Sequence, residues 1–365
     1  MGNYKNEQKV FEQYLLCQDL KRVCTTSSTN SFEGYEGDYR YTRLIHGVST
    51  AQRIFATQMI AIGRGYGWYG SVNKERVSAL LLLGGIIESE ELCPEITDSI
   101  IDNIFLENNW KWGNDLFEEY LAGKSPEAIY ARYCMDVERF WSGRFPTRPR
   151  DWDEMLGCGS PYFSQRVLRN AIEKPRAGWL VWHVDGDADT IADHTVMTQL
   201  LAIIMKKIYR YADVNLDRAL MMIDLHDLVA ASVKDVPISK DPGARLSLDA
   251  KSAAFSELMT HLSWGGIQVK RIKDLYDEAQ VGKSFDAEFA VHAGRCETSL
   301  QMKIYDEAGR VDPESAEGGT ILQNLLAVGF RISEAWILYD QKTVNYDENF
   351  IRVTDYVRRT TFQPQ

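Results

Sequence analysis

Three residues on two apolar stretches carry the side chains of a possible metal site. His194 opens IADHTVMTQLLAII after a polar turn, and the adjacent His226 and Asp227 lie near the end of LMMIDLHDLVAA. Imidazole nitrogens and carboxylate oxygens suit a divalent transition metal with open positions for water, whereas a structural zinc site more often contains thiolates. A lone histidine at a helix end more often caps the helix or packs in the core than binds a metal. A buried histidine beside a carboxylate, however, costs on the order of several kcal/mol unless it is paired or ligated, so the trio favours a metal.

Helices must position these residues, because apolar residues recur at helical spacing and no segment alternates with period two. We expect helices over residues 1–23, 41–62, 74–91 and 319–343, and a further amphipathic helix near the C-terminus. The predicted fold class is therefore all-α.

Two pairs of stretches resemble each other within the chain. Residues 73–87 run in register with 215–229, and 123–138 run without gaps against 282–297. In this register Gly84 and Gly85 stand where His226 and Asp227 stand, and His46 precedes its helix as His194 precedes its own. This pattern indicates a duplicated helical unit whose first copy has lost its ligands. The alternative is chance similarity between two amphipathic stretches.

A connector rich in proline, glycine and tryptophan, over residues 142–165, marks the predicted boundary between the two copies. We divide the chain into a first domain over residues 1–150, the degenerate copy, and a second over residues 151–365, which contains the candidate site and the C-terminal helices.

Charge and cysteine usage limit the partners of the protein. The 365 residues have a net charge of -11, which argues against a nucleic-acid surface because phosphate backbones are held by clustered Lys and Arg. The six scattered cysteines fit reduced thiols, and the first residues lack a secretory pattern. No apolar run is long enough to span a bilayer. We expect a cytoplasmic protein without nucleic-acid or membrane partners.

The motifs PRAGW, ADH, LHDLVAASVKDVP and GKSFDAEFAVHAGRCETSLQMKIYDE together resemble the HD-domain metal-dependent phosphohydrolases, in particular their 5′-deoxynucleotidase branch. The resemblance covers about 130 residues, from Pro175 to Glu307, and implies tandem HD-like helical bundles. It further implies a metal held by His194, His226 and Asp227, with cobalt, manganese, zinc, iron and magnesium all open. A (deoxy)nucleoside 5′-monophosphate is the implied substrate.

The resemblance also implies roles for residues around the metal. Arg176 and Trp179 match the positions that contact phosphate and sugar, and Asp235 joins Asp227 as a catalytic carboxylate with a general acid or base role. Single-repeat relatives pair as dimers. By analogy we expect the fused first copy to cover the face that a partner covers in those relatives, with a homodimer left open.

Two positions depart from the family pattern. The last metal-binding aspartate of the family falls on Gly294, and either Glu297, one helical turn later, or His292 is the substitute. Only Glu297 meets the spacing of one turn. A family glutamate one turn past the His-Asp pair falls on Ala230.

Three functions follow from these residues. The first is a metal-dependent phosphohydrolase acting on a small nucleotide. The alternative is a catalytically weakened or inactive nucleotide-binding or regulatory protein, because Gly294 and Ala230 remove two working groups. A di-iron oxygenase ranks last, because it needs further histidines between the His-Asp pair and the last acid.

Overall fold

The computed structural model describes residues 4–21, 48–63, 72–89, 94–107, 109–141, 167–232, 247–262, 266–312, 320–343 and 346–363. Every named element in these ranges is a helix, and one isolated antiparallel bridge joins Pro175 to Thr190. The predicted all-α fold is thus confirmed. None of the described helices combines the length and the hydrophobicity needed to cross a lipid bilayer.

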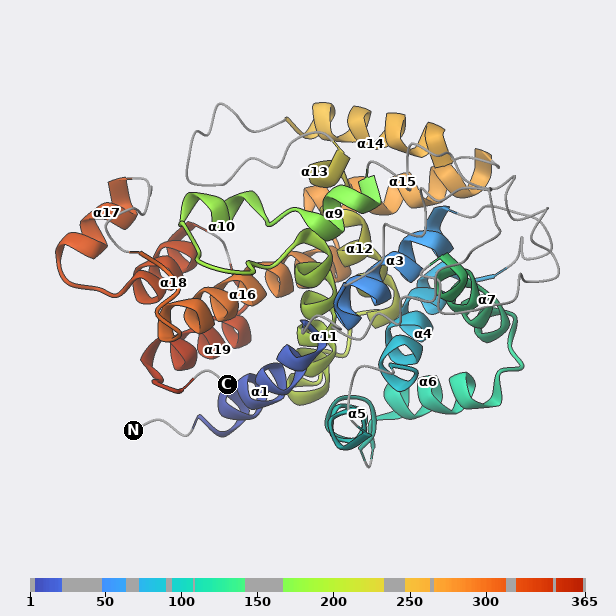
Figure 1. Cartoon of the computed structure of the whole chain (residues 1–365), viewed down its shortest axis with the longest axis horizontal. Coiled ribbons are helices and arrows are strands. Elements are labelled where there is room, and N and C mark those ends of the chain that lie inside the picture. Colours follow the sequence, from blue (N-terminus) through green and yellow to red (C-terminus); the bar gives the residue numbers. More distant parts are fainter. Residues whose placement is uncertain are drawn as a thin grey trace, which may run out of the picture.

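Figure 1 labels the helices and colours them in chain order, from α1 in blue to α19 in red. We divide them into those of the first half and those of the second half of the chain. Those of the first half are α1 Lys5–Leu16, η1 Cys17–Lys21, α3 Thr50–Gly63, α4 Lys74–Ile87, α5 Pro94–Ile100, η2 Ile101–Phe105, α6 Lys111–Ala122 and α7 Pro126–Trp141. Those of the second half are α9 Arg169–Glu173, α10 Ala177–Val181, α11 Ile191–Tyr209, α12 Leu216–His226, α13 Leu228–Ser232, α14 Leu248–Leu262, α15 Gly266–Val281, α16 Phe285–Glu307, α17 Thr320–Ala327, α18 Ile332–Thr343 and α19 Glu348–Arg359.

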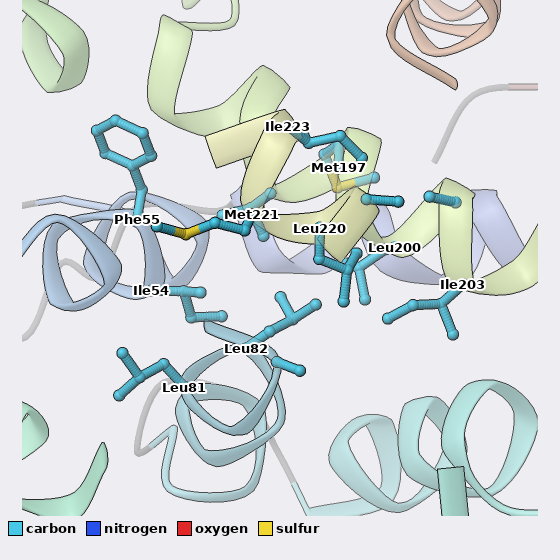
Figure 2. Close-up of a cluster of buried hydrophobic side chains, with 14 of the residues drawn as sticks. Ile54, Phe55, Leu81, Leu82, Met197, Leu200, Ile203, Leu220, Met221 and Ile223 are labelled. Atoms are coloured by element: carbon cyan, nitrogen blue, oxygen red, sulfur yellow. The ribbon is translucent and has the colours of Figure 1, made fainter. Parts of the chain in front are cut away.

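Four helices, two from each half, form the centre of the molecule. Helices α3 and α4 pack on each other, and α11 and α12 pack on them from the other half. Almost every residue of α11 is buried, as expected for a helix that is apolar on most sides. Figure 2 shows Ile54 and Leu82 of the first half facing Leu200, Leu220 and other apolar side chains of the second. The two halves therefore share one hydrophobic core.

One ion pair occurs at equivalent places in both halves. Arg76 of α4 pairs with Glu119 of α6 at 2.8 Å, and Arg218 of α12 pairs with Glu278 of α15. Each glutamate also accepts a hydrogen bond from the serine six residues later. A glycine with positive φ follows α6 and another follows α15. The two sequence registers align the arginines, the serines and the glycines, and continuing the second register by four residues toward the N-terminus also aligns the glutamates. These contacts therefore support the predicted duplication.

Helices α3 and α11 also begin alike. Each starts with a capping box in which the side chain and backbone of two residues exchange hydrogen bonds, over residues 49–52 in α3 and 190–193 in α11. The next residue is Arg53 in α3 and His194 in α11. Arg53 thus follows the first capping box as His194 follows the second. The predicted correspondence of His46 with His194 stays a prediction. His46 itself lies outside the described residues.

The helix predicted over residues 319–343 is two helices, α17 and α18. Gly329 between them has φ +90°, a left-handed conformation that ends α17. Helix α1, predicted within the first domain, packs on α11 and α19 of the second half. The 142–165 connector lies outside the described residues.

Candidate functional site

His194 lies in the first turn of α11, directly after the capping box of Thr190 and Asp193. The box fixes the start of the helix because each residue satisfies a backbone N–H of the other. The His194 side chain is only 6% exposed. Its ring therefore points into the molecule, toward the end of α12 and the middle of α16.

The His-Asp pair lies where α12 ends. His226 is the last residue of the helix, and Asp227 is its C-cap. The Asp227 carboxylate lies 2.8 Å from His226 Nδ1 through Oδ1 and 3.6 Å from His194 Nε2 through Oδ2. The structure thus brings the three predicted ligands together around Asp227. The His226 side chain is 44% exposed, so the group opens to solvent on that side.

Glu297 contacts the other ring nitrogen of His194. Its carboxylate lies 2.5 Å from His194 Nδ1 and accepts a hydrogen bond of 2.8 Å from the Tyr14 hydroxyl. An ionised carboxylate only accepts, so Nδ1 carries a proton that it donates to Glu297, and Nε2 is the ring nitrogen that faces Asp227. A carboxylate on one ring nitrogen is the arrangement usually found around a histidine that binds metal through the other nitrogen. The predicted use of Glu297 as a fourth ligand is not what its position supports, because it contacts the opposite nitrogen.

Position 294 faces the same nitrogen that Asp227 approaches. A Cβ added to Gly294 would lie 3.9 Å from His194 Nε2 and 3.8 Å from Thr198 Cγ2, both ordinary contacts. The register that places the family aspartate here therefore points to a position beside the candidate site. Glycine supplies no donor, so the site has one ligand fewer than the pattern it resembles. The alternative ligand His292 lies instead beside the rings of Tyr346 and Phe350.

The donor types fit a divalent metal ion, and their number is small. His194 Nε2, His226 and the Asp227 carboxylate are nitrogen and oxygen donors of the kind that such ions bind. They contact one another in pairs, and no three His, Cys, Asp or Glu side chains of the described ranges form a group that could hold a metal as they stand. A metal at this place would have to separate the Asp227 pairs.

Charges around the site keep its carboxylates ionised. Burial alone would raise the pKa of Asp227, but His226, Arg176 and His194 outweigh burial and hold this pKa well below its usual range. Burial also opposes ionisation of Glu297, where His194 is the strongest opposing influence and the pKa is lowered. Both groups are therefore anionic at neutral pH, as ligation and imidazole orientation require.

Arg176 lies at the edge of the site. Its Nη2 is 3.9 Å from Asp227 Oδ2, and its Nη1 donates to Thr298 Oγ1 at 3.1 Å. The side chain is 21% exposed, so the guanidinium reaches both the site and the solvent. This position agrees with the predicted contact to phosphate.

Trp179 lies away from that opening. Its side chain is buried against Tyr305, with ring centroids 5.2 Å apart, in a second apolar cluster that also contains Trp182 and Trp336. The Arg176 guanidinium lies 6.0 Å from the Trp179 ring. The predicted sugar-contacting wall is therefore covered, and Trp179 instead supports Arg176 from the core.

The remaining predictions concern the segment after α12. Asp235, the predicted general acid or base, lies outside the described residues. Ala230 lies in α13 and is partly buried against the core, with no polar side-chain atom. Sequence reasoning missed Tyr14, whose hydroxyl holds Glu297 across 283 positions of sequence. No local pattern marks such a contact, because α1 reaches it only through the tertiary fold.

Comparisons with known proteins match this part of the chain. A family model described as "HD domain" matches residues 172–318. The 5′-deoxynucleotidase HDDC2 of Bos taurus is 25% identical over 158 residues, which make up 42% of this chain and 72% of that protein. No solved structure matches. The matched segment contains His194, His226, Asp227 and Glu297.

Proposed function

Residues 172–318 are an HD domain, and from this premise we propose that the chain removes phosphate from a small nucleotide, with a (deoxy)nucleoside 5′-monophosphate as substrate. The resemblance to a 5′-deoxynucleotidase supports this substrate class. The observation that carries the proposal is the arrangement of His194: Glu297 holds Nδ1, and Nε2 faces Asp227 and position 294.

His194, His226 and Asp227 are the residues that would hold a divalent ion, which when bound lowers the pKa of a water and polarises phosphoryl oxygens. Glu297 holds a proton on His194 Nδ1, so Nε2 is the nitrogen left to bind a metal ion. The Asp227 carboxylate stays ionised because cationic neighbours lower its pKa.

Arg176 is the group that recognises the phosphate. A guanidinium binds phosphate oxygens through two parallel N–H groups, and the Arg176 side chain lies at the solvent-facing edge of Asp227. Asp235 remains the predicted general acid or base.

Gly294 and Ala230 favour a second candidate: a nucleotide-binding or regulatory protein with weak or no turnover. Gly294 removes a donor beside His194 Nε2, and Ala230 has no proton-transfer group. Loss of a general acid or base lowers a rate by about 10²- to 10⁴-fold.

One assay separates the two candidates. Protein supplied with Mn²⁺ or Co²⁺ is incubated with nucleoside mono- and triphosphates, and release of phosphate or pyrophosphate is measured. Phosphate release that disappears in His226→Ala supports the hydrolase. The matched control is His183→Asn, an exposed histidine outside the site whose φ of 46° asparagine tolerates. Thermal stabilisation by nucleotide without any release favours the second candidate.

The compartment that we propose is the cytoplasm. The described cysteines Cys17, Cys134 and Cys296 are buried free thiols, which supports a reducing environment.

A further inference from the structure

The Arg176 guanidinium is held by a neutral hydroxyl on α16 as well as by the charge of Asp227. Its Nη1 donates to Thr298 Oγ1 at 3.1 Å, whereas its Nη2 lies 3.9 Å from Asp227 Oδ2. The second separation is longer than a hydrogen bond. Within the described ranges, Thr298 is therefore the hydrogen-bond acceptor of this guanidinium, and Asp227 attracts it without accepting from it.

The Thr298 hydroxyl is fixed in the role of acceptor. It donates its own proton to the Gly294 carbonyl, one helical turn earlier, at 3.0 Å. A threonine on a helix often forms such a bond, and an arginine can only donate. The lone pairs of Thr298 Oγ1 are thus the atoms that face Arg176, and the backbone of α16 sets their direction.

The other contacts of Arg176 fix its backbone and one side of its side chain. Its backbone N–H donates to Asp189 O at 3.0 Å, next to the bridge between Pro175 and Thr190. The guanidinium lies 6.0 Å from the Trp179 ring, which offers no acceptor to it. Thr298 therefore adds the directional contact at the guanidinium itself.

Without Thr298, Asp227 would be the acceptor nearest to this guanidinium. Asp227 is ionised and its side chain is 17% exposed, so it attracts Arg176 strongly. A guanidinium that closes the gap of 3.9 Å would form an ion pair with the carboxylate. The N–H groups used in that pair would no longer be available to a phosphate.

We propose that Thr298 is a positioning residue for phosphate recognition. Its hydroxyl holds the Arg176 guanidinium open toward an incoming phosphate and keeps it from closing on Asp227. This role rests on the proposed function in one respect, namely that Arg176 contacts the phosphate. It applies equally to a chain that hydrolyses the nucleotide and to one that only binds it.

The test measures phosphate binding and not turnover. Orthophosphate is titrated by calorimetry into the full-length protein at saturating Mn²⁺. Thr298→Val removes the hydroxyl and keeps the β-branched shape. We expect it to weaken phosphate binding by about 2- to 10-fold, the effect of one long side chain that must be ordered on binding. Thr298→Ser keeps the hydroxyl and should bind phosphate as the natural protein does.

Two controls separate positioning from a general effect on the fold. Ser299→Ala removes the next hydroxyl of α16, which has no hydrogen-bond partner in the described part of the chain, and should leave phosphate affinity unchanged. In an Arg176→Gln background, Thr298→Val should cause no further loss, because the guanidinium that it positions is gone.

Three results overturn the proposed role of Thr298 and leave the proposed hydrolase standing. They are equal phosphate affinity in Thr298→Val and the natural protein, an equal loss in Thr298→Ser, and a loss that persists without Arg176. Absence of phosphate binding by the natural protein overturns the role of Thr298 together with that of Arg176. Absence of nucleotide turnover overturns the hydrolase alone, because the expected differences in phosphate affinity do not depend on it.

Discussion

Replacing Gly294 with aspartate should strengthen metal binding. The new Cβ would meet only Thr198 Cγ2 at 3.8 Å and His194 Nε2 at 3.9 Å, so the side chain enters without a clash. Its carboxylate would then lie beside the nitrogen that Glu297 leaves available, next to Asp227. The substitution supplies the oxygen donor that the site lacks.

The size of the effect follows from known metal sites. Loss of a partner that only orients a ligand costs about 10- to 100-fold in metal affinity. A direct ligand should therefore gain at least about 10-fold, or ~1.4 kcal/mol at saturating metal. Without metal the change should have the opposite sign, because the new carboxylate faces the ionised Asp227 and like charges repel.

The assay is titration of Mn²⁺ by calorimetry, with thermal unfolding in EDTA and in Mn²⁺. Gly294→Asp should unfold at a lower temperature than the natural protein in EDTA and at a higher one in Mn²⁺. Gly294→Asn is the matched control, with the same size and no charge. Equal Mn²⁺ affinity in the aspartate and asparagine variants would refute the reasoning that position 294 faces the metal.

Three further predictions test other parts of the structure. Glu297→Gln should lower Mn²⁺ affinity by about 10- to 100-fold in calorimetry, because a neutral amide holds the His194 Nδ1 proton less strongly than a carboxylate does. Burial raises the pKa of Asp224 to about 8, so folding favours its neutral form and stability falls as pH rises from about 4 to 8. Urea unfolding should show Asp224→Asn gaining about 2–3 kcal/mol on the natural protein between pH 5.5 and 7.5; a constant difference would contradict this. Gly85→Ala should destabilise by about 1–3 kcal/mol in the same assay, because its Cβ would overlap Ile54.

The sequence predicted the fold class and the core of the candidate site because both depend on local patterns. Apolar spacing of 3.6 residues identified several of the helices, including α4 and α19. The short motifs around His194, His226 and Asp227 predicted that these three residues lie close together, although they are on different helices. The break between α17 and α18 was missed because apolar residues continue on both sides of Gly329, and only the positive φ reveals the turn.

Contacts between distant helices were the part that the sequence did not predict. Gly294 and Glu297 lie three residues apart on one helix, so the sequence alone allows either position to face a metal ion. Their roles separate only when the ring of His194 is seen between them. Trp179 was misplaced for a related reason: the apolar cluster that covers it comes from α16 and α18, far along the chain.

The two halves are joined by polar contacts as well as by the apolar core, and this bears on how the chain works. Gln58 of α3 donates to Gln199 of α11 at 3.0 Å, and these two residues occupy equivalent places after the two capping boxes. Ser49 and Gln52 of the first box donate to Asp193 of the second, one residue before His194. Buried polar contacts of this kind require both partners, since an unpaired group costs about 1–3 kcal/mol. The first half therefore fixes the turn that positions His194, and removing it should disturb the site even though it supplies none of the ligands.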